Sequence, residues 1–156
     1  MIEIDIPGFR RLALSELLCD FNGTLARDGR LLADARALLP DVAKVVNIRV
    51  VTGDTFGSAR DQLRDCPCEM RLLGARDQAQ AKADLVAEIG AEHIVAIGNG
   101  RNDRLMLEMA ALGIGVVGDE GIAAEAAHAS DILTADIADA LALLLQPQRL
   151  VATLRD

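Results

Sequence analysis

The sequence predicts a three-layer α/β fold, a Rossmann-like, mostly parallel sheet with helices on both faces. First, short apolar runs alternate with helical patterns through the body of the 156-residue chain. Second, 51% of the residues are hydrophobic, yet there is no Trp or Tyr and there are only three Phe, so the core must be aliphatic. Alternation of this kind is typical of strands joined by crossover helices. The length suits one domain over residues 1–156.

The N-terminal segment predicts an edge strand or hairpin. Ile2, Ile4 and Ile6 alternate with acids, which indicates a half-exposed strand over 2–6. Pro7-Gly8 predicts a turn. The apolar run over 12–19 predicts a second strand, which is a candidate hairpin partner of the first.

The remaining elements follow in order. Helical spacing over 31–43 is interrupted by Pro40, and the helix over 78–89 is closed by Gly90. The other predicted helices cover 56–64, 103–111, 121–128 and 135–145, and the chain ends in a tail. The other predicted strands cover 47–51, 69–73, 93–97, 114–117 and 131–133. The segment between the strands ending at Cys19 and Val51 is too short for an inserted domain.

Charge and hydropathy exclude several classes of partner. The net charge is -8 and no Lys/Arg run occurs, so nucleic acid and anionic membrane are not expected as main partners. No apolar run approaches the roughly 18 residues that a membrane span requires. The N-terminus lacks the basic stretch and long apolar region of a signal peptide. We therefore expect a cytoplasmic protein.

Polar residues follow four of the predicted elements. They are Asp20-Phe21-Asn22-Gly23-Thr24, Thr52-Gly53-Asp54, the segment reaching Lys82, and Gly98-Asn99-Gly100-Arg101-Asn102-Asp103. Ligands of open α/β sheets bind at the carboxyl ends of the strands, so we expect these groups at one edge. Two carboxylates, a hydroxyl and a lysine suit phosphoryl transfer, in which one carboxylate attacks phosphorus and the cationic and N–H groups hold its oxygens.

These motifs resemble those of the haloacid dehalogenase (HAD) superfamily. Its Asp-x-Asp-x-Thr motif is matched at 20–24 except at Asn22, and its strand ending in Thr or Ser is matched by Val50-Val51-Thr52. Lys82 is the best candidate for its helical lysine. Its Gly-Asp-Gly-x-Asn-Asp-x-x-Met-Leu motif is matched at 98–107 except at Asn99. The chain looks most like a soluble, capless relative of the phosphorylation domain of P-type ATPases.

The resemblance implies an aspartyl-phosphate mechanism with Mg²⁺ as cofactor. Asp20 would be the nucleophile and a metal ligand, and the backbone carbonyl of Asn22 would be another ligand. Asp103 would be the second carboxylate, with Asn99 in the place of a further acidic ligand. Thr52, Gly53 and Lys82 would bind phosphate. Supporting roles fall to Gly23, Thr24, Asp54 and Asn102.

Two departures from the family pattern bear on the rate. The family acid at Asn22 protonates the leaving group and activates water, and such help is worth about 10²–10⁴-fold. Asn99 offers a neutral oxygen, a weaker ligand for a hard cation than a carboxylate. We therefore expect slow hydrolysis of a phosphorylated substrate, with Asp54 as a hypothetical compensating base or outer ligand.

Two other functional classes are alternatives to a phosphohydrolase. The alternative function is an inactive phosphate- or nucleotide-binding relative, which Asn22 and Asn99 favour. A phospho-receiver domain is disfavoured, because the motif at 98–107 has no place in one. With no cap, the site is open, so either the substrate is large or a second subunit closes the site in a homo-oligomer.

Overall fold

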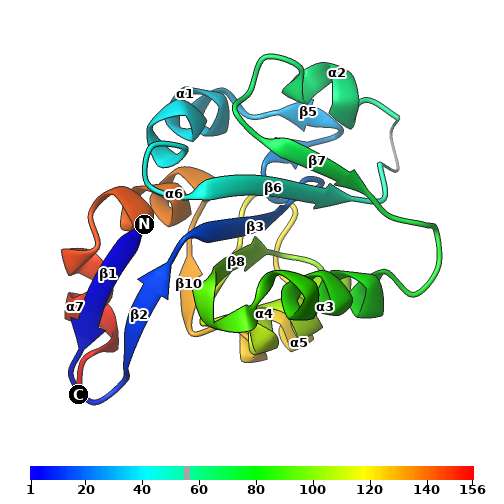
Figure 1. Ribbon diagram of the computed structural model, residues 1–156. Coiled ribbons are helices and arrows are strands. Elements are labelled where there is room, and N and C mark those ends of the chain that lie inside the picture. The colour runs from blue at the N-terminus through cyan, green and yellow to red at the C-terminus, as the bar shows by residue number, and fades with distance from the viewer. Residues whose placement is uncertain (55–56) are drawn as a thin grey trace.

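The computed structural model describes residues 1–54 and 57–156 and confirms the three-layer α/β architecture (Figure 1). One six-stranded sheet has the order β10-β9-β8-β3-β6-β7, and every neighbouring pair is parallel. Its strands are β3 (Glu16–Asp20), β6 (Asn47–Thr52), β7 (Glu69–Leu72), β8 (Ile94–Gly98), β9 (Leu112–Val116) and β10 (Ile132–Thr134).

The strand register brings the three central carboxyl ends to one level. Asp20, the last residue of β3, lies opposite Val51 of β6, and Cys19 lies opposite Ile97 of β8. The loops that follow β3, β6 and β8 therefore leave the sheet side by side, as expected for a ligand site in an open parallel sheet.

Helices cover both faces of the sheet. The helices are α1 (Ala33–Val42), α2 (Ala59–Leu63), α3 (Gln78–Ile89), α4 (Arg104–Met109), α5 (Ala124–His128), α6 (Ile137–Leu145) and α7 (Gln148–Leu154), with 3₁₀ turns η1 (Ala91–His93) and η2 (Arg101–Asp103). Helices α3, α4 and α5 pack on one face through residues such as Val86 and Met106 (Figure 1). Helices α1 and α6 pack on the other through Leu39 and Leu141.

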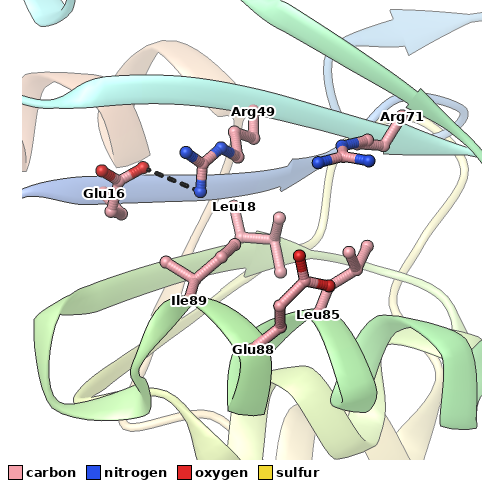
Figure 2. Close-up of a pocket in the computed structure, with 7 residues that line it drawn as sticks. All are labelled: Glu16, Leu18, Arg49, Arg71, Leu85, Glu88 and Ile89. Carbon is pink, nitrogen blue, oxygen red and sulfur yellow. Dashed lines mark ion pairs between the residues drawn. The ribbon is translucent and has the colours of Figure 1, made fainter.

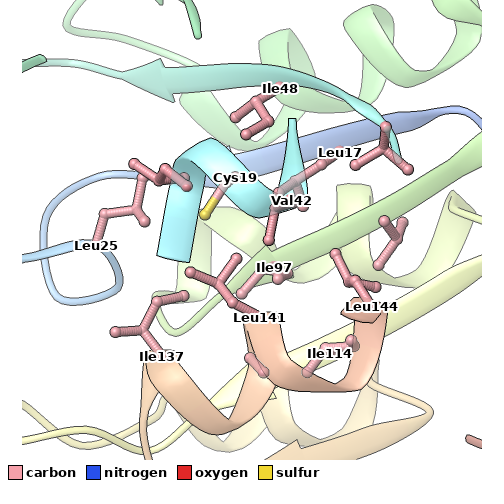
Figure 3. Packing of buried hydrophobic residues seen from close by; sticks show 14 of the residues in the cluster. Leu17, Cys19, Leu25, Val42, Ile48, Ile97, Ile114, Ile137, Leu141 and Leu144 are labelled. Carbon is pink, nitrogen blue, oxygen red and sulfur yellow. The ribbon is translucent and has the colours of Figure 1, made fainter. Parts of the chain in front are cut away.

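The core is aliphatic, as the composition predicted. Figure 3 shows Leu17 and Ile48 from the sheet meeting Val42 of α1 and Leu141 and Leu144 of α6. Complete burial of a side chain of this size contributes roughly 1.5–3 kcal/mol. This packing holds rigid the strands whose ends carry the polar loops.

The N-terminal segment departs from the expected edge strand. Strand β1 (Ile2–Ile6) pairs antiparallel with β2 (Arg10–Leu14), so the hairpin is confirmed, but it forms a sheet of its own. The run predicted as one strand over 12–19 divides at Ser15 into β2 and β3, because the chain leaves the hairpin there to enter the main sheet. Ile6 and Leu14 are buried.

Three further differences concern the connections. The predicted tail contains helix α7, which packs on the hairpin side of the molecule (Figure 1). The predicted helix over 56–64 is shortened to α2, and residue 56 lies outside the described residues. A small hairpin, β4 (Ala26–Arg27) with β5 (Arg30–Leu31), follows the first motif.

The described connections leave the sheet without a cap domain. Between β3 and β6 the chain holds only the β4–β5 hairpin and α1, and between β7 and β8 only α3 and η1. Among the described residues, no helix combines the length and apolar character needed to cross a bilayer.

Candidate active site

A buried lysine joins two buried carboxylates at the carboxyl end of the sheet. The Lys82 Nζ atom lies 2.6 Å from Asp20 Oδ1 and 2.5 Å from Asp103 Oδ1. The Lys82 side chain is 1% exposed and that of Asp103 is 0% exposed. The three residues come from α3, β3 and η2, so the sheet topology brings together groups that are distant in the sequence.

Helix α3 places Lys82 over the sheet. Ala83 and Val86 are buried on the same helix, which fixes the face that α3 turns toward the strands. Burial lowers the pKa of Lys82, but the carboxylates of Asp20 and Asp103 outweigh that effect and raise it above its usual value. Lys82 is therefore a buried ammonium group, which is tolerated because carboxylates pair with it.

Asp103 ties this ion pair to the loop after β8. Its Oδ2 atom accepts hydrogen bonds from the backbone N–H of Asn99 at 3.0 Å and of Gly100 at 2.8 Å. A Cβ on Gly98 would lie 2.6 Å from Asp103 Cγ, so only glycine leaves room for this carboxylate. Because Lys82 and two backbone N–H groups occupy its two oxygens, Asp103 positions Lys82 and the loop. Ligation of a metal by Asp103 stays a prediction.

Asp20 is the carboxylate of this group that reaches the mouth of the site. It keeps 6% of its surface exposed, and its Oδ2 atom accepts a hydrogen bond from Thr24 Oγ1 at 3.3 Å. Burial, followed by the negative charge of Asp103, raises the pKa of Asp20 from 3.8 to about 7. The site therefore holds more negative charge than Lys82 neutralises.

Thr24 connects the loop after β3 with the loop after β8. Its hydroxyl also lies 3.2 Å from Asn99 Oδ1, and Asn99 Nδ2 donates to the Gly121 carbonyl at 3.0 Å. That second bond turns the amide oxygen of Asn99 toward Thr24. Gly23 has a φ of 81°, and its N–H donates to the Ala26 carbonyl at 2.8 Å, so the turn after Asp20 depends on glycine.

The residues around Asp20 fit a hydrated hard cation. Asp20 offers a carboxylate and Asn99 an amide oxygen, and the buried Asn22 Oδ1 atom has no hydrogen-bond partner among the described residues. No three His, Cys, Asp or Glu side chains gather for a metal ion within residues 1–54 and 57–156. Mg²⁺ usually keeps several waters and binds through one or two carboxylates, so this sparse donor set suits it.

The loop after β6 contributes a hydroxyl and a helix cap. Thr52 is buried, and its Oγ1 atom accepts from the Asp54 N–H at 2.9 Å; among residues 1–54 and 57–156 its hydroxyl proton has no acceptor. Asp54 accepts from the Ala59 N–H at 2.9 Å and so caps α2. Within the described part of the chain, Thr52 makes no hydrogen bond to Asp20 or Lys82.

Sequence reasoning missed two residues at the mouth of the site. Gln78 accepts from Asn102 Nδ2 at 2.9 Å, and its Nε2 atom would contact a Cβ on Gly53, so it lies between the loops after β6 and β8. It lies one turn before Lys82 on α3, and residues four apart share a face of a helix, so this spacing places Gln78 on the same face as Lys82. Glu120 follows β9, and the strand-end reasoning applied to the other loops extends to it.

A cavity of about 270 Å³ lies away from this site, between the sheet and the end of α3 (Figure 2). It is lined by Glu16, Leu18, Arg49, Arg71, Leu85, Glu88 and Ile89. Its arginines are already paired, Arg49 with Glu16 at 3.3 Å and Arg71 with Glu69 at 3.1 Å. The cavity therefore contributes nothing to the site around Asp20.

Solved structures share this fold at low sequence identity. The 3-deoxy-D-manno-octulosonate 8-phosphate phosphatase of Moraxella catarrhalis, in complex with magnesium ion, phosphate ion and KDO, has a TM-score of 0.71 at 16% identity over 89% of this chain and 90% of that chain. The cobalt-bound phosphatase of Haemophilus influenzae has a TM-score of 0.70 at 16% identity, covering 89% and 91%. A putative HAD superfamily (subfamily III A) hydrolase of Legionella pneumophila has 0.70 at 14% identity, covering 90% and 87%.

One curated relative is similar in sequence. It is "Uncharacterized protein MJ0073" of Methanocaldococcus jannaschii, 50% identical over 80 residues, which are 49% of this chain and 86% of the relative. No protein-family model matches the chain. The chain therefore belongs to the family of the M. jannaschii protein MJ0073, and it has the capless fold of HAD superfamily hydrolases.

Proposed function

We propose that the protein is a slow phosphohydrolase that forms an aspartyl-phosphate on Asp20. The observation that carries the proposal is the buried Lys82 ammonium group between Asp20 and Asp103, at the carboxyl ends of parallel strands. A cation held there at the cost of desolvation suits a reaction in which negative charge arrives next to Asp20.

In the first step, an Asp20 oxygen bonds to phosphorus while the bond from phosphorus to the ester oxygen breaks. The leaving oxygen keeps the electron pair and takes a proton from solvent, because Asn22 has no proton to transfer. Lys82, the Thr52 hydroxyl and the backbone at Gly53 would bind the phosphoryl oxygens; Lys82 already contacts the nucleophile Asp20. Asp103 holds Lys82 in position.

In the second step, water attacks the phosphorus of the aspartyl-phosphate, its proton passes to solvent, and Asp20 leaves as a carboxylate. A general base at position 22 would remove the proton from this water, and an amide cannot. Loss of such help is worth about 10²–10⁴-fold in rate, so we expect slow turnover.

A divalent cation, with Mg²⁺ as the expected metal, belongs to this proposal. Asp20, the backbone carbonyl of Asn22 and the Asn99 amide oxygen would hold it. When bound, it would neutralise charge on the phosphate and on the carboxylate. The open mouth suits a large phosphorylated substrate, or closure of the site by a second copy of the chain.

The second candidate is a phosphate- or nucleotide-binding protein without turnover. Asn22 and Asn99 favour it, because proton transfer and strong binding of a hard cation call for acids, and both positions carry amides. In this case the ligand would bind at Asp20 and Lys82 and leave unchanged.

The test is hydrolysis of p-nitrophenyl phosphate with Mg²⁺, with Asp20→Asn as the inactive variant and exposed Asp61→Asn as the matched control. We expect slow hydrolysis that Asp20→Asn abolishes and Asp61→Asn retains. Acid quenching followed by peptide mass analysis should find one phosphoryl group on the peptide containing Asp20. No hydrolysis above the Asp20→Asn level, together with thermal stabilisation by phosphate, would support the binding protein instead.

A further inference from the structure

A carboxylate absent from the motif comparison lies beside Asn99. Glu120 belongs to the turn after β9, and a Cβ built on Gly23 would lie 2.9 Å from Glu120 Oε2 and 2.8 Å from Asn99 Oδ1. The distance between these two oxygens cannot exceed the sum of those values. A cation and one water can bridge such a gap, since Mg²⁺–oxygen distances are about 2.1 Å and hydrogen bonds about 2.8 Å.

The turn that carries Glu120 is fastened to both loops of the site. Asn99 donates through Nδ2 to the Gly121 carbonyl at 3.0 Å and accepts at its own carbonyl from Ala123 N–H at 2.9 Å. On the other side, Asp119 pairs with Arg27 at 2.5 Å. The position of Glu120 next to Asn99 therefore follows from the packing of the turn.

The two oxygens of Glu120 have different surroundings. Oε1 accepts from the Asp28 N–H at 3.4 Å, a long hydrogen bond, while Oε2 is the oxygen that faces Gly23 and Asn99. Glu120 is exposed, so its carboxylate is accessible to water. The arrangement leaves one carboxylate oxygen directed at the mouth of the site.

The negative charge of Glu120 adds to the charge available for binding a divalent cation. With Asp20 and Asp103 both ionised, their two negative charges exceed the one positive charge of Lys82, so these three groups leave a single net negative charge for a divalent cation. Asn99 adds none. Glu120 supplies a second negative charge from a different strand end.

We propose that Glu120 completes a divalent-cation site with Asp20 and Asn99, reaching the cation through water. Glu120, in the turn after β9, supplies the negative charge that the neutral Asn99 does not. The inference rests on the cation of the proposed function, and it concerns binding of the ion, which is measured without any substrate.

The experiment is a titration of the whole protein with Mn²⁺, following free Mn²⁺ by electron paramagnetic resonance. Glu120→Gln removes the charge, and Glu108→Gln makes the same change at an exposed glutamate on α4. Loss of an outer-shell partner of a metal costs about 10–100-fold in affinity, so we expect this loss for Glu120→Gln and less than about twofold for Glu108→Gln. Asn99→Asp added to Glu120→Gln should restore the affinity.

Several outcomes overturn the inference. They are absence of Mn²⁺ binding in the wild type, equal affinities for the two single variants, and failure of Asn99→Asp to restore binding to Glu120→Gln. Glu120-dependent Mn²⁺ binding without phosphomonoester hydrolysis would refute the proposed function and leave this inference standing. Hydrolysis combined with the same Mn²⁺ affinity in the wild type and in Glu120→Gln would refute this inference and leave the proposed function standing.

Discussion

Replacement of Asp20 by Asn is expected to make the fold more stable at neutral and alkaline pH. Burial and the charge of Asp103 disfavour the ionised form of Asp20, whose pKa is raised from 3.8 to about 7. Asn keeps the shape of the side chain and can still accept a hydrogen bond from Lys82. The variant therefore removes an unfavourable buried charge without opening a cavity, and Lys82 keeps Asp103 as its partner.

The magnitude follows from the pKa difference. A shift of one unit corresponds to about 1.4 kcal/mol, so the raised pKa of Asp20 sets an upper limit of roughly 4 kcal/mol. Loss of part of the Lys82 interaction lowers the expected gain to about 2–4 kcal/mol at pH values above about 7. Substitution of an active-site residue often raises stability, because the groups that function requires there are held at a cost in stability.

The sign can be checked by varying pH. Between about pH 4 and pH 7, the folded chain keeps a proton on Asp20 that the unfolded chain has lost, so this group lowers the wild-type stability as pH rises through that range. Asp20→Asn lacks this dependence. The two proteins should differ little near pH 4, and the variant should be more stable near pH 8.

The assay is urea unfolding followed by circular dichroism in EDTA, near pH 4 and near pH 8, with exposed Asp61→Asn as the control. Taking the difference between variant and wild type removes the pH dependence of the other acids. The reasoning is refuted if the Asp20→Asn difference is the same at both pH values, or if the wild type is the more stable protein near pH 8.

Three further predictions follow from the geometry. Lys82→Met should cost about 3–5 kcal/mol in urea unfolding near pH 8, because it leaves the two buried carboxylates without a counter-charge. Asn22→Asp should raise kcat for p-nitrophenyl phosphate by about 100-fold or more, because it supplies a general acid and base. Gly113→Ala should cost about 1–3 kcal/mol, because its Cβ would lie 2.5 Å from the Leu107 carbonyl oxygen.

Each of these variants has a matched control. Lys44→Met removes an exposed lysine, Asn102→Asp adds an acid outside the proton-transfer position, and Gly74→Ala adds a Cβ where nothing lies within 4 Å. We expect little change in stability for the first and third and no gain in kcat for the second. A test variant that behaves like its control contradicts the corresponding argument.

The parts of the fold with strong local signals could be predicted from the sequence. The helix over 78–89 was predicted with the bounds that α3 has, because Gly90 marks its end and its apolar spacing is regular. The N-terminal hairpin was predicted, but its separation from the main sheet was not. Whether an apolar run such as 12–19 divides at Ser15 depends on long-range pairing, which alternation alone does not encode.

Within the site, motif spacing predicted the residues that the ion pair brings together. Asp20, Lys82 and Asp103 meet because strand ends of a parallel sheet converge. Glu120 and Gln78 lie outside those motifs; a strand end and one helical turn point to them, but their closeness to Gly23 and Gly53 depends on loop packing. Asp54 was weighed as a base, and the structure uses one of its oxygens to cap α2.

The bonds made by Gly23 and Gly100 also bear on the chemical lifetime of the site. Asn22 and Asn99 each precede a glycine, the sequence context in which an asparagine side chain is most readily attacked by the next backbone nitrogen and loses ammonia. The two nitrogens in question already donate, Gly23 to the Ala26 carbonyl and Gly100 to Asp103. These hydrogen bonds should slow that reaction in the folded protein, whereas in an unfolded sample the conversion of both amides to acids should be faster. Intact-mass measurement should accompany any assay of turnover.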